Sequence, residues 1–303
     1  MIVTIEDAVF ASRVDPLLLL SLIRHGFEGR HIVLTSPLFK QGGRQHVNTW
    51  LMARDVLVRD AVMAAFDRSL KALPSSASCV EIRVTDRKQS HWAGTPPLLT
   101  PEDAALVLAL PLRLVLENRL TDKHFLLCVA SEPRRTALRK ALVQGWCRAE
   151  HGGGLGDMGN YLDSLREDSA ERLRTWVMFD SDAPAPGQPS EQSNVLKQKC
   201  EGASVPHHQL QRRSIENYLP PRALWQWAGT FRGFASTKRQ RSVQEFEAMP
   251  VEQRHHLDMK KKFDEDIAEL FREDKFKIDP EGLRQDGQRP EIDSLLQGLF
   301  ERM

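Results

Sequence analysis

The stretch that decides the fold is Trp176-Val177-Met178-Phe179-Asp180-Ser181-Asp182, an apolar run that ends in two aspartates. Two other acidic residues also follow apolar residues: Glu117 follows Leu114-Val115-Leu116, and Glu216 follows Ile215. In parallel α/β sheets, ligands bind at the carboxyl ends of the strands, so acidic residues that follow several strands can face one point. Carboxylates at one point repel one another unless a cation lies between them, and hard cations such as Mg²⁺ prefer oxygen ligands. We therefore expect a parallel sheet with a metal site suited to phosphate chemistry.

The composition indicates a globular protein of about two domains. The chain has 303 residues, of which 41% are hydrophobic and 27% charged, and its formal net charge is +1. A surface that binds nucleic acid therefore has to be a local patch. The four cysteines form no CxxC pair, which argues against a zinc ribbon and fits a reducing cytosol. We see no signal-peptide pattern and no apolar stretch long enough to span a bilayer, so we expect a cytoplasmic protein without membrane contact.

The pattern of elements divides the chain into three regions of an α/β protein. Residues 1–108 are expected to form an N-terminal accessory region with helices from Pro16 and within 50–73. Residues 109–222 alternate strand and helix, which predicts a parallel sheet flanked by helices. Residues 223–303 are expected to be a helical region that completes the domain. Within the last two regions we expect strands at 113–117, 176–179 and 209–216 and helices at 122–129, 136–143, 161–173, 194–199 and 252–273.

Four stretches of the middle region resemble the TOPRIM domain, in the version found in OLD-family nucleases and related stand-alone defence nucleases. These stretches are 114–118 with 121–126, 152–154, 179–182 and 212–219. The resemblance covers roughly residues 112–222 and implies a Rossmann-like parallel sheet whose acidic residues bind Mg²⁺ or Mn²⁺. Glu117 and Asp122 are five residues apart, whereas many members space this pair by four. The sequence has no GxxxxGK[ST] string, so the ATPase domain of OLD nucleases proper is not part of it.

The resemblance also implies roles for single residues. Glu117, Asp180 and Asp182 would be catalytic, and these three would bind the metal together with Asp122 and Glu216. A lysine-bearing segment of OLD-like proteins resembles residues 255–262, and it points to Lys260 or Lys261 as a further catalytic residue. Two cations about 4 Å apart can activate water and stabilise the leaving oxygen in phosphodiester cleavage.

Each of these residues also has an ordinary structural interpretation. Asp122 fits a helix N-cap as well as a second metal ligand. Glu216 lies beside Arg212 and Arg213 in the sequence, which makes a structural ion pair an alternative for it. Glu117 has the same alternative with Arg119, and the lysines fit a solvated basic turn of a helix.

Other motifs bear on nucleic-acid binding. Arg212 and Arg213 are expected to contact nucleic acid, as is a patch of Lys238, Arg239 and Arg241 with Arg232, Phe231 and Phe234 nearby. Basic patches of this size also occur on ordinary surfaces.

The string Gly154-Leu155-Gly156-Asp157-Met158-Gly159 matches GxGxxG, but we expect no strand directly before it and therefore no dinucleotide site. It fits a tight turn, either close to the metals or purely structural. The pairs His207-His208 and His255-His256 are not spaced as zinc ligands on a helix.

Together these features predict a metal-dependent endonuclease that cuts DNA or RNA. The family resemblance suggests the nuclease effector of a bacterial anti-phage defence system, toxic when released and acting with a separate ATPase partner. One alternative is a non-catalytic regulatory or nucleic-acid-binding subunit of an ATPase complex. Another is a phosphatase or phosphotransferase that uses Asp180 as its nucleophile, for which Glu216 would be dispensable.

Overall fold

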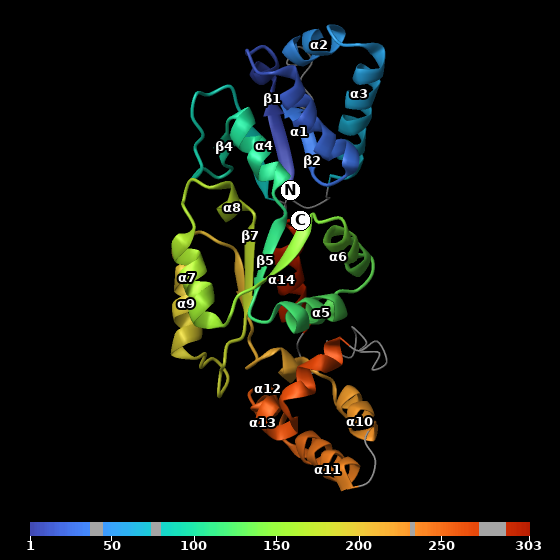
Figure 1. The fold of residues 1–303 in the computed structure, drawn as a ribbon, viewed down its shortest axis with the longest axis vertical. Helices are drawn as coiled ribbons and strands as arrows, with labels where there is room; N and C mark the ends of the chain where they lie inside the picture. Colours follow the sequence, from blue (N-terminus) through green and yellow to red (C-terminus); the bar gives the residue numbers. More distant parts are fainter. Residues whose placement is uncertain (37–44, 74–79, 231–233, 273–288) are drawn as a thin grey trace. The chain divides into compact units, whose positions relative to one another are not determined.

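The chain folds into two compact units (Figure 1), seen in a computed structural model that describes residues 1–36, 45–73, 80–230, 234–272 and 289–303. Unit 1 consists of Met1–Leu112, Leu165–Arg174 and Leu299–Met303. Unit 2 consists of Arg113–Ser164 and Thr175–Gly298. No helix in the described part of the chain is long and apolar enough to cross a membrane.

Unit 1 is built on a four-stranded sheet in the order β2-β1-β3-β4, in which all neighbouring strands pair in parallel. The three central residues of both β1 and β2 are buried, as expected for strands covered by helices. The strands are β1 (Ile2–Glu6), β2 (Ile32–Ser36), β3 (Glu81–Val84) and β4 (Leu98–Leu99). The helices are η1 (Asp7–Phe10), α1 (Pro16–Glu28), α2 (Gln45–Met52), α3 (Val56–Lys71), α4 (Pro101–Ala109) and α8 (Ala170–Leu173).

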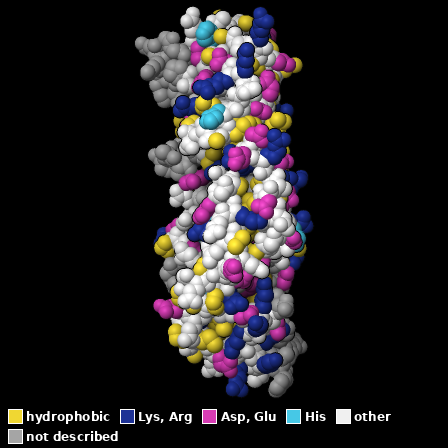
Figure 2. Space-filling view, turned by 90° about the vertical axis from the view of Figure 1, so that its left-hand side faces the viewer, with side chains coloured by type: hydrophobic (Ala, Val, Ile, Leu, Met, Phe, Trp, Pro, Cys, Tyr) yellow, Lys and Arg dark blue, Asp and Glu magenta, His cyan; other side chains and the backbone are white. Residues whose placement is uncertain are grey.

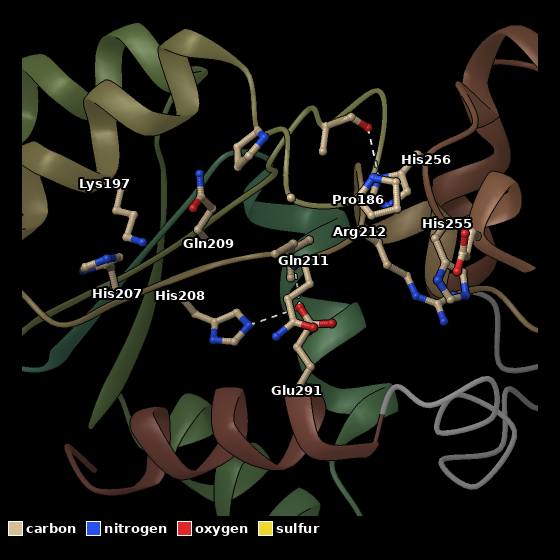
Figure 3. Close-up of a pocket in the computed structure, with 15 residues that line it drawn as sticks. Pro186, Lys197, His207, His208, Gln209, Gln211, Arg212, His255, His256 and Glu291 are labelled. Carbon is tan, nitrogen blue, oxygen red and sulfur yellow. Dashed lines mark hydrogen bonds and ion pairs between the residues drawn. The ribbon is translucent and has the colours of Figure 1, made fainter.

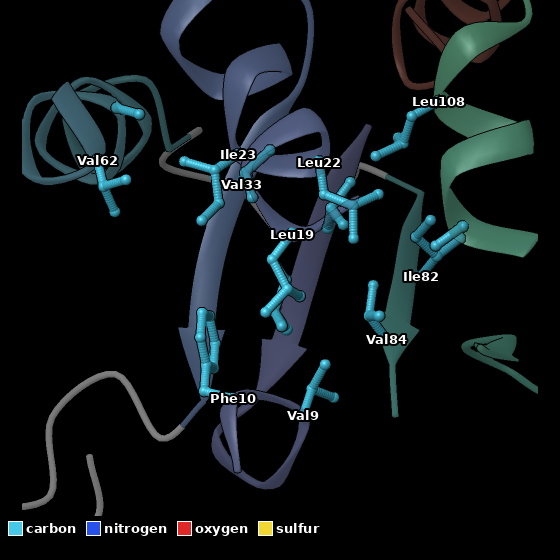
Figure 4. Packing of buried hydrophobic residues seen from close by; sticks show 14 of the residues in the cluster. Val9, Phe10, Leu19, Leu22, Ile23, Val33, Val62, Ile82, Val84 and Leu108 are labelled. Atoms are coloured by element: carbon cyan, nitrogen blue, oxygen red, sulfur yellow. The ribbon is translucent and has the colours of Figure 1, made fainter. Parts of the chain in front are cut away.

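Helix α1 supplies the centre of the unit 1 core. Figure 4 shows Leu19 and Leu22 of this helix facing the strands, with side chains of α3 and α4 closing the core at its sides. Gly26 allows the close approach of α1, because a Cβ there would lie 2.9 Å from the Ser69 hydroxyl and 3.2 Å from the Val33 Cβ. The Ser69 hydroxyl in turn accepts a hydrogen bond from the Val33 amide at 3.0 Å. The missing side chain of Gly26 thus allows α1 to pack closely against β2 and α3.

Unit 2 contains a second four-stranded sheet in the order β6-β5-β7-β8. Strand β7 pairs in parallel with β5 and with β8, and all five of its residues are buried, as in a strand with helices on both faces. Figure 1 shows α7 and α9 to one side of β5 and β7, and α5 and α6 to the other. The strands are β5 (Leu112–Leu116), β6 (Cys147–His151), β7 (Thr175–Phe179) and β8 (His207–Gln209).

Helices account for most of the remaining residues of unit 2. Those around the sheet are α5 (Arg119–Val129), α6 (Arg134–Val143), α7 (Leu155–Ser164), α9 (Glu191–Gly202) and α14 (Arg289–Phe300). Those after β8 are η2 (Ile215–Tyr218), α10 (Pro221–Gly229), α11 (Phe234–Ala248), α12 (Val251–His255), α13 (Met259–Phe263) and η3 (Glu265–Phe271).

The α/β class predicted from the sequence is confirmed, but two strand predictions are wrong. The strand expected at 209–216 ends at Gln209, because the Ser214 amide and hydroxyl both bond to the Asn217 side chain and start the short helix η2. Residues 147–151 form strand β6, where no strand was expected. Only Cys147 of this strand is buried, so the polar composition reflects a place at the edge of the sheet.

Three helix predictions also need correction. The helical stretch within 50–73 is divided between α2 and α3. Helix α3 begins after Asp55, whose side-chain oxygen accepts the Leu57 amide and caps the helix. The helix expected at 161–173 instead begins at Leu155, ends at Ser164 and is followed by the short α8. The long helix expected at 252–273 is broken into α12, α13 and η3; Asp258 caps α13, and Asp264 ends it at a backbone φ of 131°.

Candidate active site

Acidic residues from three separate segments of unit 2 line one cavity of about 300 Å³, called here the acidic cavity. Glu117 directly follows β5 and Asp180 directly follows β7, and these strands are parallel neighbours, so both residues lie at one edge of the sheet. Glu216 lies on η2, which follows β8. The other residues that line the cavity are Asn118, Thr121, Asp122, His151, Gly153, Gly154, Ile215 and Lys260.

The carboxylates of the acidic cavity lack enough partners for their charge. Glu216 is 2% exposed, and its Oε1 lies 3.5 Å from Lys260 Nζ. Among the described residues, the Oε2 atoms of Glu216 and of Glu117 are buried without a hydrogen-bond partner. A buried polar atom without a partner is costly, and a buried charged one more so. The cavity is therefore suited to receive a cationic group.

The pKa values of Glu117, Asp122 and Asp180 are all raised. Burial is the largest cause for Asp180, whose pKa lies well above its ordinary value, and the charges of Glu117 and Glu216 add to it. Burial also raises the pKa of Glu117, helped by Asp182 and opposed by Lys260 and by a hydrogen bond from the Asp180 backbone. Such crowding of buried carboxyls marks the cavity as a candidate functional site.

Lys260 is a positively charged side chain among the residues that line the cavity. Burial lowers its pKa, but Glu216, Asp180 and Glu117 outweigh that effect, so its pKa is raised and the side chain is a cation at neutral pH. The neighbouring Lys261 is 85% exposed and pairs with Asp258 at 3.0 Å. Of the two lysines singled out by the sequence, Lys260 is therefore the one in the cavity.

Asp122 takes part in the start of helix α5. The Asn118 side chain accepts the amides of Leu120 and Thr121, and Asp122 Oδ2 accepts the Asn118 amide at 2.9 Å. Asp122 is 6% exposed, and burial raises its pKa to about 7, with Glu117 and Glu216 adding to the shift. The residue thus stabilises the helix start and also lines the cavity.

The turn from β6 to α7 brings backbone close to the acidic cavity. Gly153 and Gly154 have φ angles of +73° and +96°, which residues with a side chain rarely adopt. The Gly152 amide donates to the Leu116 carbonyl at 2.6 Å, just before Glu117. The glycine turn expected near the acidic residues therefore lies beside them, and it follows a strand.

Three other expected site residues lie outside the acidic cavity. Asp182 is exposed and has a φ of +50°, although its charge acts on Glu117. Arg212 is buried; its Nη1 donates to the Asn217 carbonyl at 2.6 Å, and its guanidinium lies 5.0 Å from the centre of the Tyr218 ring. Arg213 pairs with Asp258 at 3.5 Å. The ion pair considered for Glu216 is made with Lys260 instead.

The expected nucleic-acid patch lies on α11 and is partly engaged in internal contacts. Lys238 is exposed, whereas Arg239 pairs with Asp264 at 2.6 Å and lies 4.3 Å from the Trp227 ring centre, and Arg241 pairs with Glu245 at 3.2 Å. Phe231 and Arg232 lie outside the described residues, as does the side chain of Phe234. Figure 2 shows Lys and Arg side chains gathered over the lower end of the view, where Figure 1 draws α11 and α13.

A second and larger cavity of unit 2 was not predicted from the sequence. It has a volume of about 720 Å³ and is called here the histidine pocket, because His207, His208, His255 and His256 all line it (Figure 3). The two histidine pairs were the only signal in the sequence, and their spacing did not reveal that β8 and α12 bring them together. Its other lining residues are Ala183, Pro186, Gly187, Pro189, Lys197, Gln209, Leu210, Gln211, Arg212, Glu252 and Glu291.

Comparison with known proteins returns no match: no protein-family model fits the chain, and searches of curated proteins and of solved structures find no significant similarity.

Proposed function

We propose that this protein is a metal-dependent endonuclease whose acidic cavity hydrolyses phosphodiester bonds in nucleic acid. The observation that supports this most is the convergence of Glu117, Asp180 and Glu216 with Lys260, in a cavity where two buried carboxylate oxygens have no partner among the described residues. Carboxylates at the ends of parallel strands with a nearby cationic side chain suit the binding of a metal and a phosphate together.

The donor set fits a hard divalent cation such as Mg²⁺ or Mn²⁺, because these ions take carboxylate oxygens as ligands. Glu117, Asp180 and Glu216 would hold it. Asp122 also lines the cavity, and the charge of Asp182 acts on Glu117. A bound cation would activate water and stabilise the charge that develops on the phosphate. Among the described residues, no three His, Cys, Asp or Glu side chains are arranged as a ready-made metal site. The proposal therefore rests on charge, burial and chain topology.

The protein's own groups have clear tasks in such a reaction. Lys260 keeps its proton because of the surrounding carboxylates, so it can bind an anionic phosphate oxygen in the ground state and in the transition state. Gly154 leaves open space for a phosphate that approaches the cavity, because a Cβ placed there would have no neighbouring atom within 4 Å. Burial raises the pKa values of Glu117 and Asp180, and neighbouring carboxylates add to both shifts, so a bound cation would relieve the repulsion between these carboxylates.

The wider role rests on the resemblance to OLD-family TOPRIM nucleases. On that basis we propose a cytoplasmic nuclease effector of anti-phage defence that works with a separate ATPase protein.

Cleavage of plasmid DNA and of total cellular RNA by purified protein tests the proposal, with Mg²⁺, Mn²⁺ or EDTA in the buffer. We expect cutting that needs the metal and that falls at least about 10³-fold in Asp180→Asn, since the change removes a ligand charge but keeps the side-chain shape. Asp163→Asn, exposed on α7 outside the cavity, is the matched control and should cut like the wild type. Cutting that persists in EDTA, or that Asp180→Asn leaves intact, would refute the proposal. If neither substrate is cut, the assay is repeated with the product of the neighbouring gene, and failure there favours the non-catalytic alternative.

A further inference from the structure

The histidine pocket lies next to the acidic cavity, because three chain segments contribute to both. Asp180, Glu216 and Lys260 line the acidic cavity. Their neighbours in the sequence, Ala183, Arg212 and His256, line the histidine pocket. Members of each pair are three or four residues apart in the sequence, and four residues span at most about 14 Å. A nucleic-acid strand advances about 3.4 Å per stacked nucleotide, so a strand cut in the acidic cavity has neighbouring nucleotides within reach of the histidine pocket.

The charges of the histidine pocket nearly cancel. Lys197 and Arg212 are opposed by Glu252 and Glu291. Glu291 is buried, and its Oε1 accepts the Gln211 amide at 2.7 Å and the Tyr218 hydroxyl at 2.6 Å, with His208 Nε2 at 3.4 Å. Its charge is thus held by fixed donors. A pocket with so little net charge is suited to an uncharged ligand group that makes hydrogen bonds, and less to a bare phosphate.

Two of the histidines have a lowered pKa and an Nδ1 atom close to a backbone carbonyl. Burial is the largest cause of a lowered pKa for both His207 and His256. His207 Nδ1 lies 3.2 Å from the Val205 carbonyl, and His256 Nδ1 lies 3.2 Å from the Ala183 carbonyl. A carbonyl accepts, so Nδ1 carries the proton in each ring and Nε2 is an acceptor. The pocket therefore combines imidazole acceptors with the side-chain amide of Gln211 and with the carbonyl end of the Gln209 amide, whose Nε2 donates to the Ser193 hydroxyl at 2.7 Å.

This chemistry matches the edge and face of a nucleobase. Glutamine amides and ring acceptors bond to base edges, while Pro186 and the ring of His207, which stacks on Phe179 at 6.2 Å, offer flat surfaces. A base inside a duplex cannot enter a concave pocket of this kind without leaving its stack. Sequence-dependent contacts with single bases are typical of unpaired loops and ends.

We propose that the histidine pocket holds one unpaired nucleotide of the substrate strand, within about four positions of the bond cut in the acidic cavity. The substrate class is then single-stranded nucleic acid, including unpaired loops and ends of folded RNA. This inference rests on the proposed endonuclease function, but its test does not require cleavage.

Binding of a short fluorescent oligonucleotide, measured by anisotropy in EDTA, tests the pocket. The protein carries Asp180→Asn throughout, so neither hydrolysis nor metal contributes. We expect the single strand to bind about tenfold more tightly than the same sequence in a blunt duplex. His207→Phe combined with Gln211→Ala keeps the ring that packs on Phe179 and should weaken single-strand binding about tenfold. Gln198→Ala, exposed on α9 outside the pocket, is the control and should bind like the parent.

Three outcomes overturn the inference: no binding of the single strand, equal binding of strand and duplex, or a double variant that binds within about twofold of its parent. Lys197→Gln gives a second reading if the double variant does not fold, because Lys197 is exposed and its loss should weaken single-strand binding about threefold. A pocket that fails these tests while the wild type still cuts nucleic acid in Mg²⁺ would leave the proposed function intact. Selective binding of the single strand without any cutting of nucleic acid would support the pocket and contradict the proposed endonuclease function.

Discussion

The acidic cavity should make the metal-free protein less stable as pH rises, and Asp122 allows this effect to be measured. Its pKa is raised from an ordinary 3.8 to about 7, and it is buried. A pKa difference of one corresponds to about 1.4 kcal/mol, so the ionised carboxylate costs the folded state about 4 kcal/mol above pH 7. Asp122→Asn removes this charge, and its side-chain oxygen can still accept the Asn118 amide. After allowance for imperfect hydrogen bonding, we expect the variant to be about 1–3 kcal/mol more stable at pH 8 in EDTA.

The sign of the pH dependence follows from which state binds the proton. Between pH 8 and pH 4 the folded protein takes up a proton at Asp122 before the unfolded chain does, so its stability rises as pH falls. With a folded pKa of about 7, the gain between pH 8 and pH 6 is about 1.4 kcal/mol. For a chain of this size that gain corresponds to a rise of about 2 °C in the midpoint of thermal unfolding.

Differential scanning calorimetry of the wild type and of Asp122→Asn at pH 8 and pH 6, both in EDTA, measures the effect. The quantity to compare is the difference between the two pH responses, because histidines titrate in the same range and their contribution cancels. Asp163→Asn, exposed and outside the cavity, should respond to pH as the wild type does. An Asp122→Asn protein that is less stable at pH 8, or that keeps the full pH response, would refute the electrostatic reasoning.

Three further predictions follow from particular contacts. Lys260→Met should lower kcat/KM for nucleic-acid cleavage by about 10²–10³-fold, because it removes the cation beside Glu216, whereas Lys261→Met should have little effect; steady-state kinetics of the pair checks this. Gly26→Ala should lower the free energy of unfolding in urea by about 1–3 kcal/mol, because its Cβ would press against Ser69 and Val33; an unchanged midpoint would contradict the packing. Burial and then Arg30 lower the pKa of His25 to about 4, so the unfolded chain is protonated first as pH falls; with allowance for solvent screening of this half-buried group, stability should fall by about 1 kcal/mol from pH 8 to pH 5, and urea unfolding of His25→Gln should lose that part of the response.

The sheet of unit 2 could be predicted where a strand is buried on both faces, because burial then leaves a continuous apolar run in the sequence. All five residues of β7 are buried, so the strand is a continuous apolar run that can be recognised without a partner. Once β5 and β7 are parallel neighbours, Glu117 and Asp180 have to lie at the same edge. Strand β6 could not be recognised in this way, because four of its five residues are partly or fully exposed and no apolar pattern remains.

Tertiary contacts decide the features that the sequence left open. Lys260 and Lys261 occupy adjacent positions of a short helix, where successive side chains point about 100° apart, so only the packing of α13 determines which one reaches Glu216. The end of β8 depends on the bonds between Ser214 and Asn217, which compete with a strand that the residue types alone permit. The histidine pocket arises because β8 and α12 lie together although they are far apart in the sequence.

The division of the chain into units has a consequence for its synthesis on the ribosome. Unit 1 takes up 165–174 and 299–303, and the chain passes between the units after Leu112, Ser164, Arg174 and Gly298. The late residues make specific bonds there: the Glu301 carbonyl accepts the Val80 amide, and the Arg302 carbonyl accepts the Arg174 side chain. The first unit to emerge is thus the last to receive its complete set of contacts. A nascent chain can assemble the acidic cavity before unit 1 is finished, so the carboxylates of the cavity can come together while unit 1 still lacks its last segment.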